Sequence, residues 1–221
     1  MENTNTQNQL FPVFLKLKGK TVLIVGGGRI ALEKLRTVLR NSPDAWIYVV
    51  APEVSEEIKS VASENQAVFI WNETFQPHHL NDIDLVITAT GIRQVAEDVK
   101  HIAEEKRIWV NTADIPDLCD FYLGGVVIKG PLKIAVSTNG KSPVMARRLR
   151  EVLEEAIPDE AAISIEQLHE LRKFLKGDFT NRVKELNHAT RLLVKRKTRK
   201  PRLHRIKQWI SGASATGNTH I

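Results

Sequence analysis

TVLIVGGGRIA, residues 21–31, decides the fold of this chain. Its first part, Thr21–Val25, is apolar at consecutive positions, which is typical of a strand buried on both faces. The following residues fit G-x-G-x-x-A: Gly26 permits a tight turn, Gly28 lets the backbone approach a pyrophosphate, and Ala31 lets a helix pack closely on the sheet. The N-terminus of that helix offers N–H groups to phosphates. The stretch therefore predicts a dinucleotide site, with a glycine turn that binds no ligand as the alternative.

The chain continues to alternate between β-branched runs and amphipathic stretches as far as residue 112. Repeated strand–helix–strand units imply right-handed crossovers and parallel strands. We therefore predict an α/β fold with a Rossmann-like doubly wound parallel sheet, forming an NAD-binding domain over residues 1–115. The further strands are expected at residues 45–50, 67–71, 85–89 and 109–112, and the helices at residues 30–40, 52–65 and 92–106.

Beyond residue 115 the pattern changes. Two strands, residues 121–128 and 132–137, are predicted around Lys129-Gly130-Pro131, because Gly and Pro favour a turn. The next helix follows Ser142, a good N-cap, and Pro143 suits its first position. The regions expected are a small α+β region (116–157), a helical region with a basic tail (158–210, with helices at 161–175 and 180–194), and a disordered end (211–221).

Composition excludes several classes of protein. Of the 221 residues, 42% are hydrophobic and 26% are charged, as in an ordinary globular chain. No apolar run reaches the roughly 18 residues that a membrane-spanning helix needs, and the N-terminal MENTNTQNQL lacks the order of a secretory signal. Cys119 is the only cysteine, which excludes an internal disulfide and a thiolate cluster for a metal. We expect a cytoplasmic protein with no membrane partner.

The formal net charge of +6 comes from one segment of the chain. Nine of the 32 Lys and Arg residues lie between Leu186 and Ile210, where no acid occurs, so the rest of the chain carries 23 basic and 26 acidic residues. Such a segment can steer an anionic substrate, bind nucleic acid or an acidic partner, or serve as a solvated extension. Nucleic acid is the least expected of these, because Trp209 is the only aromatic residue near the basic run.

An acidic residue is expected near the end of the second strand, where it would bind the ribose hydroxyls of a dinucleotide. Glu53 lies slightly late for this role, and Asp44 lies before the strand, where a turn residue is expected. No arginine follows the strand to receive a 2′-phosphate. The sequence therefore favours NAD over NADP.

Asn111–Pro116, NTADIP, follows the fifth strand at the carboxyl edge of the sheet, where ligands bind in open α/β folds. The Asp114 carboxylate could take a proton in step with hydride loss to nicotinamide. The alternatives are that Asp114 caps a turn stiffened by Pro116, and that Asn111 serves only the backbone.

The segment before the helix at Pro143 is a candidate substrate site. Small hydroxyl and glycine residues ahead of a helix N-terminus can receive carboxylates, and Arg147, Arg148 and Arg150 follow on the helix. A capped helix in a subunit interface is the other reading. The expected substrate-binding residues are Ser137, Thr138, Lys141 and Ser142.

Five motifs occur together in an order that resembles precorrin-2 dehydrogenase, the N-terminal part of siroheme synthase: FPVFL (11–15), GGGRIALEK with Lys34, VVAPE (49–53), NTADIP and STNGKSPVMARRLRE (137–151). The resemblance covers residues 11–160. It implies NAD-dependent aromatisation of precorrin-2 to sirohydrochlorin, with Asp114 as the catalytic residue. It also implies a homodimer formed through the region after Pro116. The expected cofactor-binding residues are Gly26, Gly28, Arg29, Ile30, Pro52, Glu53, Thr88 and Asn111.

Two departures from the family pattern bear on the site. Gly91 stands where relatives often carry an acid or amide, and Thr138 stands where serine is common. The family often also inserts Fe²⁺ into sirohydrochlorin, so iron is a possible substrate. The seven histidines include no pair at metal-ligand spacing, and no resident metal is expected. The alternative function is a regulatory NAD-binding module, for transport or redox sensing, without turnover.

Overall fold

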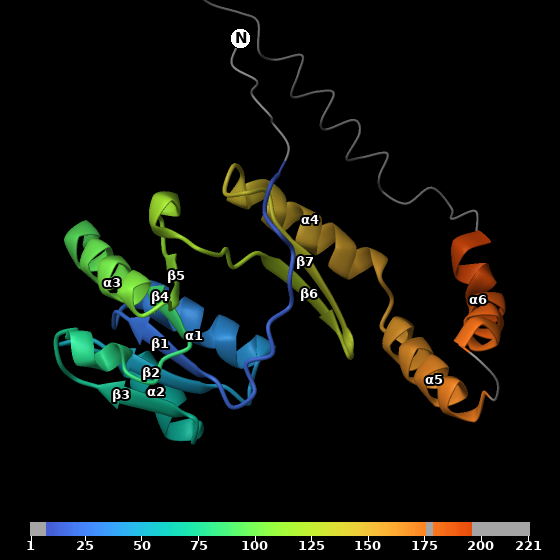
Figure 1. Ribbon diagram of the computed structural model, residues 1–221, viewed down its shortest axis with the longest axis horizontal. Helices are drawn as coiled ribbons and strands as arrows, with labels where there is room; N and C mark the ends of the chain where they lie inside the picture. The colour runs from blue at the N-terminus through green and yellow to red at the C-terminus, as the bar shows by residue number, and fades with distance from the viewer. Residues whose placement is uncertain (1–7, 176–178, 196–221) are drawn as a thin grey trace, which may run out of the picture. The chain divides into compact units, whose positions relative to one another are not determined.

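The computed structural model describes residues 8–175 and 179–195, which divide into two compact units (Figure 1). The first unit extends to Gly124 and includes Ser137–Pro143, whereas the second comprises Gly125–Val136 and the chain from Val144. The boundary expected after residue 115 therefore differs from the observed one. The expected disordered end, residues 211–221, and most of the basic tail lie outside the described residues.

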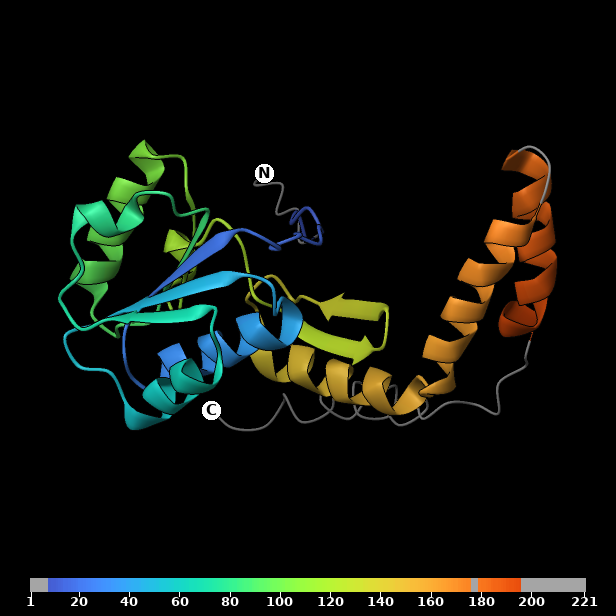
Figure 2. The same ribbon diagram turned by 90° about the horizontal axis from the view of Figure 1, so that it is seen from below.

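The first unit contains a five-stranded, wholly parallel sheet with strand order β3-β2-β1-β4-β5 (Figures 1 and 2). Because β1 lies at the centre and the strand order reverses beside it, the predicted doubly wound topology is confirmed. The strands are β1 (Thr21–Val25), β2 (Trp46–Val50), β3 (Val68–Trp71), β4 (Leu85–Thr88) and β5 (Trp109–Thr112).

Helices cover both faces of this sheet (Figure 2). On one face α1 (Arg29–Asn41) and α2 (Glu56–Glu64) pack on the alternate side chains of β1 that include Ile24. On the other, α3 (Arg93–Glu105) and the 3₁₀ turn η1 (Pro77–Leu80) pack on the set that includes Leu23. Val22–Val25 are at most 2% exposed, which explains the uninterrupted apolar run.

Helix α2 begins at Glu56, so the predicted start at Pro52 was wrong. Ser55 is the N-cap, and its side chain accepts a hydrogen bond from the Ile58 N–H at 3.4 Å. The Ser55 N–H donates to the Gly27 carbonyl at 2.9 Å. This tertiary contact keeps the chain extended where it runs beside the glycine loop. The helix therefore begins only after Ser55.

The strand predicted at residues 121–128 was also placed too early, because β6 begins at Gly125. After the 3₁₀ turn η2 (Pro116–Leu118), the chain instead folds back along β5. The Asp120 N–H donates to the Val110 carbonyl, and the Val110 N–H donates to Asp120 Oδ2, both at 2.8 Å. Residues near 120 thus satisfy the free edge of the outermost strand.

The second unit is an α+β arrangement built on the antiparallel hairpin of β6 (Gly125–Lys129) and β7 (Leu132–Val136). Gly130 has φ +56°, as expected for the turn predicted at Lys129–Pro131. No helix within residues 8–175 and 179–195 is long and apolar enough to span a membrane. The helices of this unit are α4 (Pro143–Ala156), α5 (Glu160–Phe174) and α6 (Phe179–Lys195).

We expect Asp84→Asn to destabilise the first unit at pH 7, because it removes a charged hydrogen-bond acceptor. The loss should be only about 1 kcal/mol, because this carboxylate lies partly in solvent. Asp84 accepts from Lys20 Nζ at 2.7 Å and from the Thr21 N–H at 2.9 Å, contacts that lower its pKa below 3.8. A lowered pKa stabilises the fold above the unfolded value and loses that effect as the carboxylate protonates. In urea denaturation, the free energies of unfolding of the unaltered protein and of Asp84→Asn should converge as the pH falls. An undiminished difference in this free energy below pH 3 would contradict the prediction.

Candidate functional site

The three glycines of the loop Gly26–Gly28 differ in the space that surrounds them. Gly26 has φ +133°, and a Cβ there would overlap the Ala89 carbonyl. A Cβ on Gly27 would overlap the Glu53 carbonyl oxygen and lie 3.0 Å from the Ala51 Cβ. A Cβ on Gly28 would meet nothing within 4 Å. Two glycines therefore allow close packing within the protein, and the third leaves open space beside the loop.

Helix α1 begins at this open space. Gly28 is its N-cap and offers no side chain to the helix, while its carbonyl accepts the Leu32 N–H at 3.0 Å. The N–H groups of the first helical turn have no acceptor within the helix. The turn contains no acidic side chain to repel an anion. These features fit a phosphate group.

A groove of about 580 Å³ lies over the loop. It brings together the carboxyl ends of several strands, as expected for a ligand site in an open parallel sheet. Thr90 closes one side with a turn in which its Oγ1 accepts the Ile92 N–H at 3.1 Å. Lining residues that bear on a dinucleotide are Gly26, Gly28, Arg29, Ile30, Pro52, Glu53, Phe75, Thr90 and Gly91.

Six of the eight residues predicted to bind the cofactor are thus gathered in one groove. Glu53 comes slightly after the end of β2, but it still lines the groove. Its carbonyl lies against Gly27 of the glycine loop. Gly91 has φ +69°, a conformation that glycine adopts freely and that Asn and Asp tolerate best among other residues. Glycine therefore suits the backbone conformation at position 91.

The other two predicted cofactor residues, Thr88 and Asn111, do not line the groove. Thr88 is 1% exposed, and its hydroxyl, like that of Thr112, lacks a hydrogen-bond partner within the described part of the chain. Asn111 is 7% exposed and donates its amide to the Phe121 carbonyl at 2.8 Å. This contact supports the alternative reading, in which Asn111 serves the backbone.

Asp114 lies immediately beyond β5, on a strained turn. Its φ is +62°, an unusual conformation for a residue with a side chain. The neighbouring Ala113 N–H donates to the Thr88 carbonyl at 2.9 Å, which ties the turn to the end of β4. The side chain is exposed, and none of the described residues bonds to its carboxylate. Asp114 is therefore an available carboxylate at the carboxyl edge of the sheet.

The predicted substrate residues form a self-bonded loop that belongs to the first unit. Thr138 Oγ1 accepts the Ser142 N–H at 3.2 Å and donates to the Ser142 carbonyl at 3.1 Å, while Ser137 Oγ accepts the Asn139 N–H at 3.2 Å. The Thr138 hydroxyl therefore shapes the loop, whereas Lys141 is exposed to solvent. Their contact with a substrate stays a prediction.

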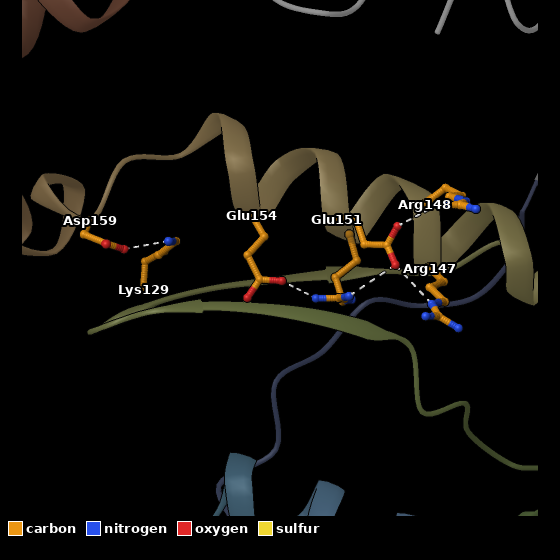
Figure 3. A network of polar contacts seen from close by, with 7 residues as sticks. Lys129, Arg147, Arg148, Glu151, Glu154 and Asp159 are labelled. Carbon is orange, nitrogen blue, oxygen red and sulfur yellow. Dashed lines mark hydrogen bonds and ion pairs between the residues drawn. The ribbon is translucent and has the colours of Figure 1, made fainter.

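The arginines of α4, considered within the second unit, are paired with acids on the same helix (Figure 3). Arg147 Nε donates to Glu151 Oε1 at 3.0 Å, and Arg148 donates to Glu151 Oε2 at 3.2 Å. The hydrogen bond from Arg147 lowers the pKa of Glu151. Arg150 pairs with Glu154. Charge on this helix is largely balanced locally.

A side-chain cluster that the sequence reasoning missed joins η1 to the loop that precedes it. Glu73, His78 and His79 each place a potential ligand atom within 4.8 Å of the others. His79 Nδ1 accepts the Gln76 N–H at 2.8 Å, which places the proton on Nε2, 3.1 Å from Glu73 Oε1. A protonated ring nitrogen cannot bind a metal. The cluster therefore fixes this loop, whose Phe75 lines the groove.

Comparisons with known proteins agree with this geometry. The family described as "Putative NAD(P)-binding" matches residues 13–125, just over half of the chain, and "Sirohaem biosynthesis protein central" matches residues 129–156. The structure of SirC, precorrin-2 dehydrogenase, is similar with a TM-score of 0.68 and 27% identity, covering 81% of this chain and 88% of that one.

Curated relatives include siroheme synthases. That of Nitrosomonas europaea is 42% identical over 147 residues, 66% of this chain and 30% of that protein. That of Pseudoalteromonas translucida is 41% identical over 150 residues, 68% of this chain and 31% of that protein. The chain spans less than a third of the length of these relatives. The family resemblance drawn from the motifs is confirmed.

We expect Gly27→Ala to lower mainly the stability of the protein, and Gly28→Ala to lower mainly its affinity for NAD. The first inserts a methyl group into the Glu53 carbonyl and should cost roughly 3 kcal/mol of stability. The second has space and an ordinary φ of −96°, so it should cost under about 1 kcal/mol. It should nevertheless weaken NAD binding roughly tenfold, because the methyl group occupies the phosphate approach. Urea denaturation and calorimetric titration measure both effects; undiminished NAD affinity in Gly28→Ala would exclude this cradle.

We expect Thr88→Val to raise stability by about 1 kcal/mol and to leave NAD affinity unchanged, because a buried, unpaired hydroxyl is replaced by a methyl group. Thr90→Val is the matched control. It removes a bonded hydroxyl that lines the groove, and both properties should decline. Weaker NAD binding by Thr88→Val would restore the cofactor contact expected from the sequence.

Proposed function

This chain belongs to the family of putative NAD(P)-binding proteins, and we propose that it is an NAD-dependent dehydrogenase that converts precorrin-2 to sirohydrochlorin. The observation that carries the proposal is the free Asp114 carboxylate, on a left-handed turn at the same sheet edge as the nicotinamide-dinucleotide groove. A module that only senses a cofactor has no use for such a group. The similarity to precorrin-2 dehydrogenase supplies the substrate class.

The reaction removes a hydride and a proton from the macrocycle. The bound dinucleotide supplies the hydride acceptor. Asp114 receives the proton at a carboxylate oxygen, and the protonated acid then releases it to water. The turn holds this carboxylate in solvent, where its oxygens can accept the proton. The loop at Gly26–Gly28 orients the dinucleotide through its phosphates.

NAD is the proposed form of the cofactor. Glu53 lines the groove at the end of β2, where a carboxylate bonds to ribose hydroxyls and repels a 2′-phosphate. Arg29 is the one cation that lines the groove within the described residues, and it lies at the start of α1, next to the phosphate cradle. This division of charge supports NAD over NADP.

The substrate carboxylates are proposed to bind at the loop that contains Ser137, Thr138, Lys141 and Ser142. Lys141 supplies an exposed positive charge, and the internal bonds of Thr138 pre-organise the loop. The family match over residues 129–156 supports a role in the same pathway for the adjoining segment. Homodimer formation through the region after Pro116 and a cytoplasmic location remain part of the proposal.

Fe²⁺ insertion into sirohydrochlorin stays a prediction, with iron as a substrate. It requires a base to take the pyrrole protons, and Asp114 is the available carboxylate. A regulatory NAD-binding module would account for the groove, but it gives no reason for the Asp114 turn or for the match to the sirohaem central family. We therefore favour the enzyme.

We expect Asp114→Asn to lower kcat roughly 100-fold while the Kd for NAD stays within about twofold, because an amide cannot take the proton and the groove is unchanged. The assay mixes protein, precorrin-2 and NAD or NADP, and follows the reduced cofactor and sirohydrochlorin together. Addition of Fe²⁺ to the product, with and without protein, tests chelation.

The matched control for this assay is Asp117→Asn, which neutralises an exposed carboxylate on the neighbouring turn η2. It should retain the activity of the unaltered chain. Equal losses in the two variants would indicate a general charge effect and remove Asp114 from the mechanism. NAD binding without turnover by the unaltered chain would favour the regulatory module.

A further inference from the structure

We propose that Cys119 is a positioning residue, which holds the turn that carries Asp114 in the geometry that proton transfer requires. The inference rests on the proposed function, because it assigns Cys119 a role through Asp114. It concerns a side chain that does not touch the cofactor groove and that no sequence motif singled out.

The thiol of Cys119 lies inside the turn and bonds to both of its ends. The Thr112 N–H donates to Sγ at 3.2 Å. Sγ lies 3.2 Å from the Thr112 carbonyl oxygen and 3.4 Å from the Ile115 carbonyl oxygen, and these two acceptors share the single thiol proton. Asn111 adds an amide donor at 3.6 Å from the same sulfur. One atom therefore links the end of β5 to the residue that follows Asp114.

Asp114 needs such support because little else holds it. Its left-handed φ of +62° is costly for a residue with a Cβ and persists only where the surroundings impose it. Its own side chain is exposed and makes no bond within the described residues. The position of the carboxylate consequently depends on the backbone of residues 112–115. That backbone is held by the Ala113–Thr88 bond, by the Leu118 N–H, which donates to the Ile115 carbonyl at 3.1 Å, and by the sulfur of Cys119.

The protein in turn fixes Cys119 through the next residue. Asp120 makes two hydrogen bonds with Val110, and its Oδ1 accepts from Lys100 Nζ at 2.6 Å. The Lys100 side chain is only 12% exposed, which makes this ion pair less mobile than a surface pair. These bonds of Asp120 hold the neighbouring residue 119 at the edge of β5, with its thiol at the turn.

The properties of a thiol suit this place. Burial raises the pKa of Cys119, which favours the protonated thiol, and its one proton is shared between the Thr112 and Ile115 carbonyls. Sulfur is large enough to fill the turn while it also accepts the Thr112 N–H. Alanine would leave that N–H without its partner, whereas serine preserves the donor and acceptor on a smaller atom.

The test compares Cys119→Ala, Cys119→Ser and the control Ile47→Val in the full chain. Ile47 is 0% exposed in the core at β2, which β1 and β4 separate from β5, so its truncation destabilises the sheet away from the sulfur contacts. We expect Cys119→Ala to lower kcat at least tenfold, with the Kd for NAD within twofold of the unaltered value. Cys119→Ser should recover part of kcat, and Ile47→Val should lose melting temperature but keep kcat.

Equal losses of kcat in Cys119→Ala and Ile47→Val, or full activity in Cys119→Ala, would overturn the inference. Hydrogen–deuterium exchange of the amides of residues 112–115 gives a readout independent of turnover. Exchange should rise in Cys119→Ala and stay unchanged in Ile47→Val. If the unaltered chain shows no turnover, the proposed function fails, and this exchange alone decides whether Cys119 holds the turn; unaltered exchange in Cys119→Ala would refute it.

Discussion

The first unit depends on the close approach of the glycine loop to two carbonyl groups. Side chains at Gly26 or Gly27 would overlap the backbone of Ala89 or Glu53, so only glycine lets the carboxyl ends of β1, β2 and β4 converge here. The same approach directs the start of α1 toward the groove and holds the chain extended before α2. One steric constraint therefore shapes the groove and sets the helix boundaries around it.

The edge of the sheet at β5 follows a different physical solution. An outermost strand has unpaired backbone groups, and here a returning segment satisfies them with both backbone and side chain. Asp120 and Cys119 perform this task beside the turn in which Asp114 has a left-handed conformation and its carboxylate lies in solvent. The first unit thus combines a groove over a helix N-terminus with an exposed carboxylate at the same sheet edge, as the proposed dehydrogenase reaction requires.

Charge in the second unit is mostly neutralised where it arises. The arginines of α4 pair with Glu151 and Glu154, and Lys129 pairs with Asp159 at 2.6 Å (Figure 3). Arg147 and Arg148 are 77% and 73% exposed, so these pairs are screened by solvent and contribute little stability. An anion that bound Arg147 or Arg148 would have to compete with Glu151 for them.

The sequence by itself determined the parallel sheet, the glycine loop and the place of Asp114, because strand periodicity, glycine spacing and the residues after a strand are local patterns. The tertiary structure decided which side chains share the groove. It excluded Thr88 and Asn111, explained Gly27, and brought His79 to Glu73 and Cys119 to the Asp114 turn. These contacts join residues across loops and strands, and their geometry depends on how the backbone turns between them. The spacing of residues along the sequence does not specify that geometry, so it can be seen only in the folded chain.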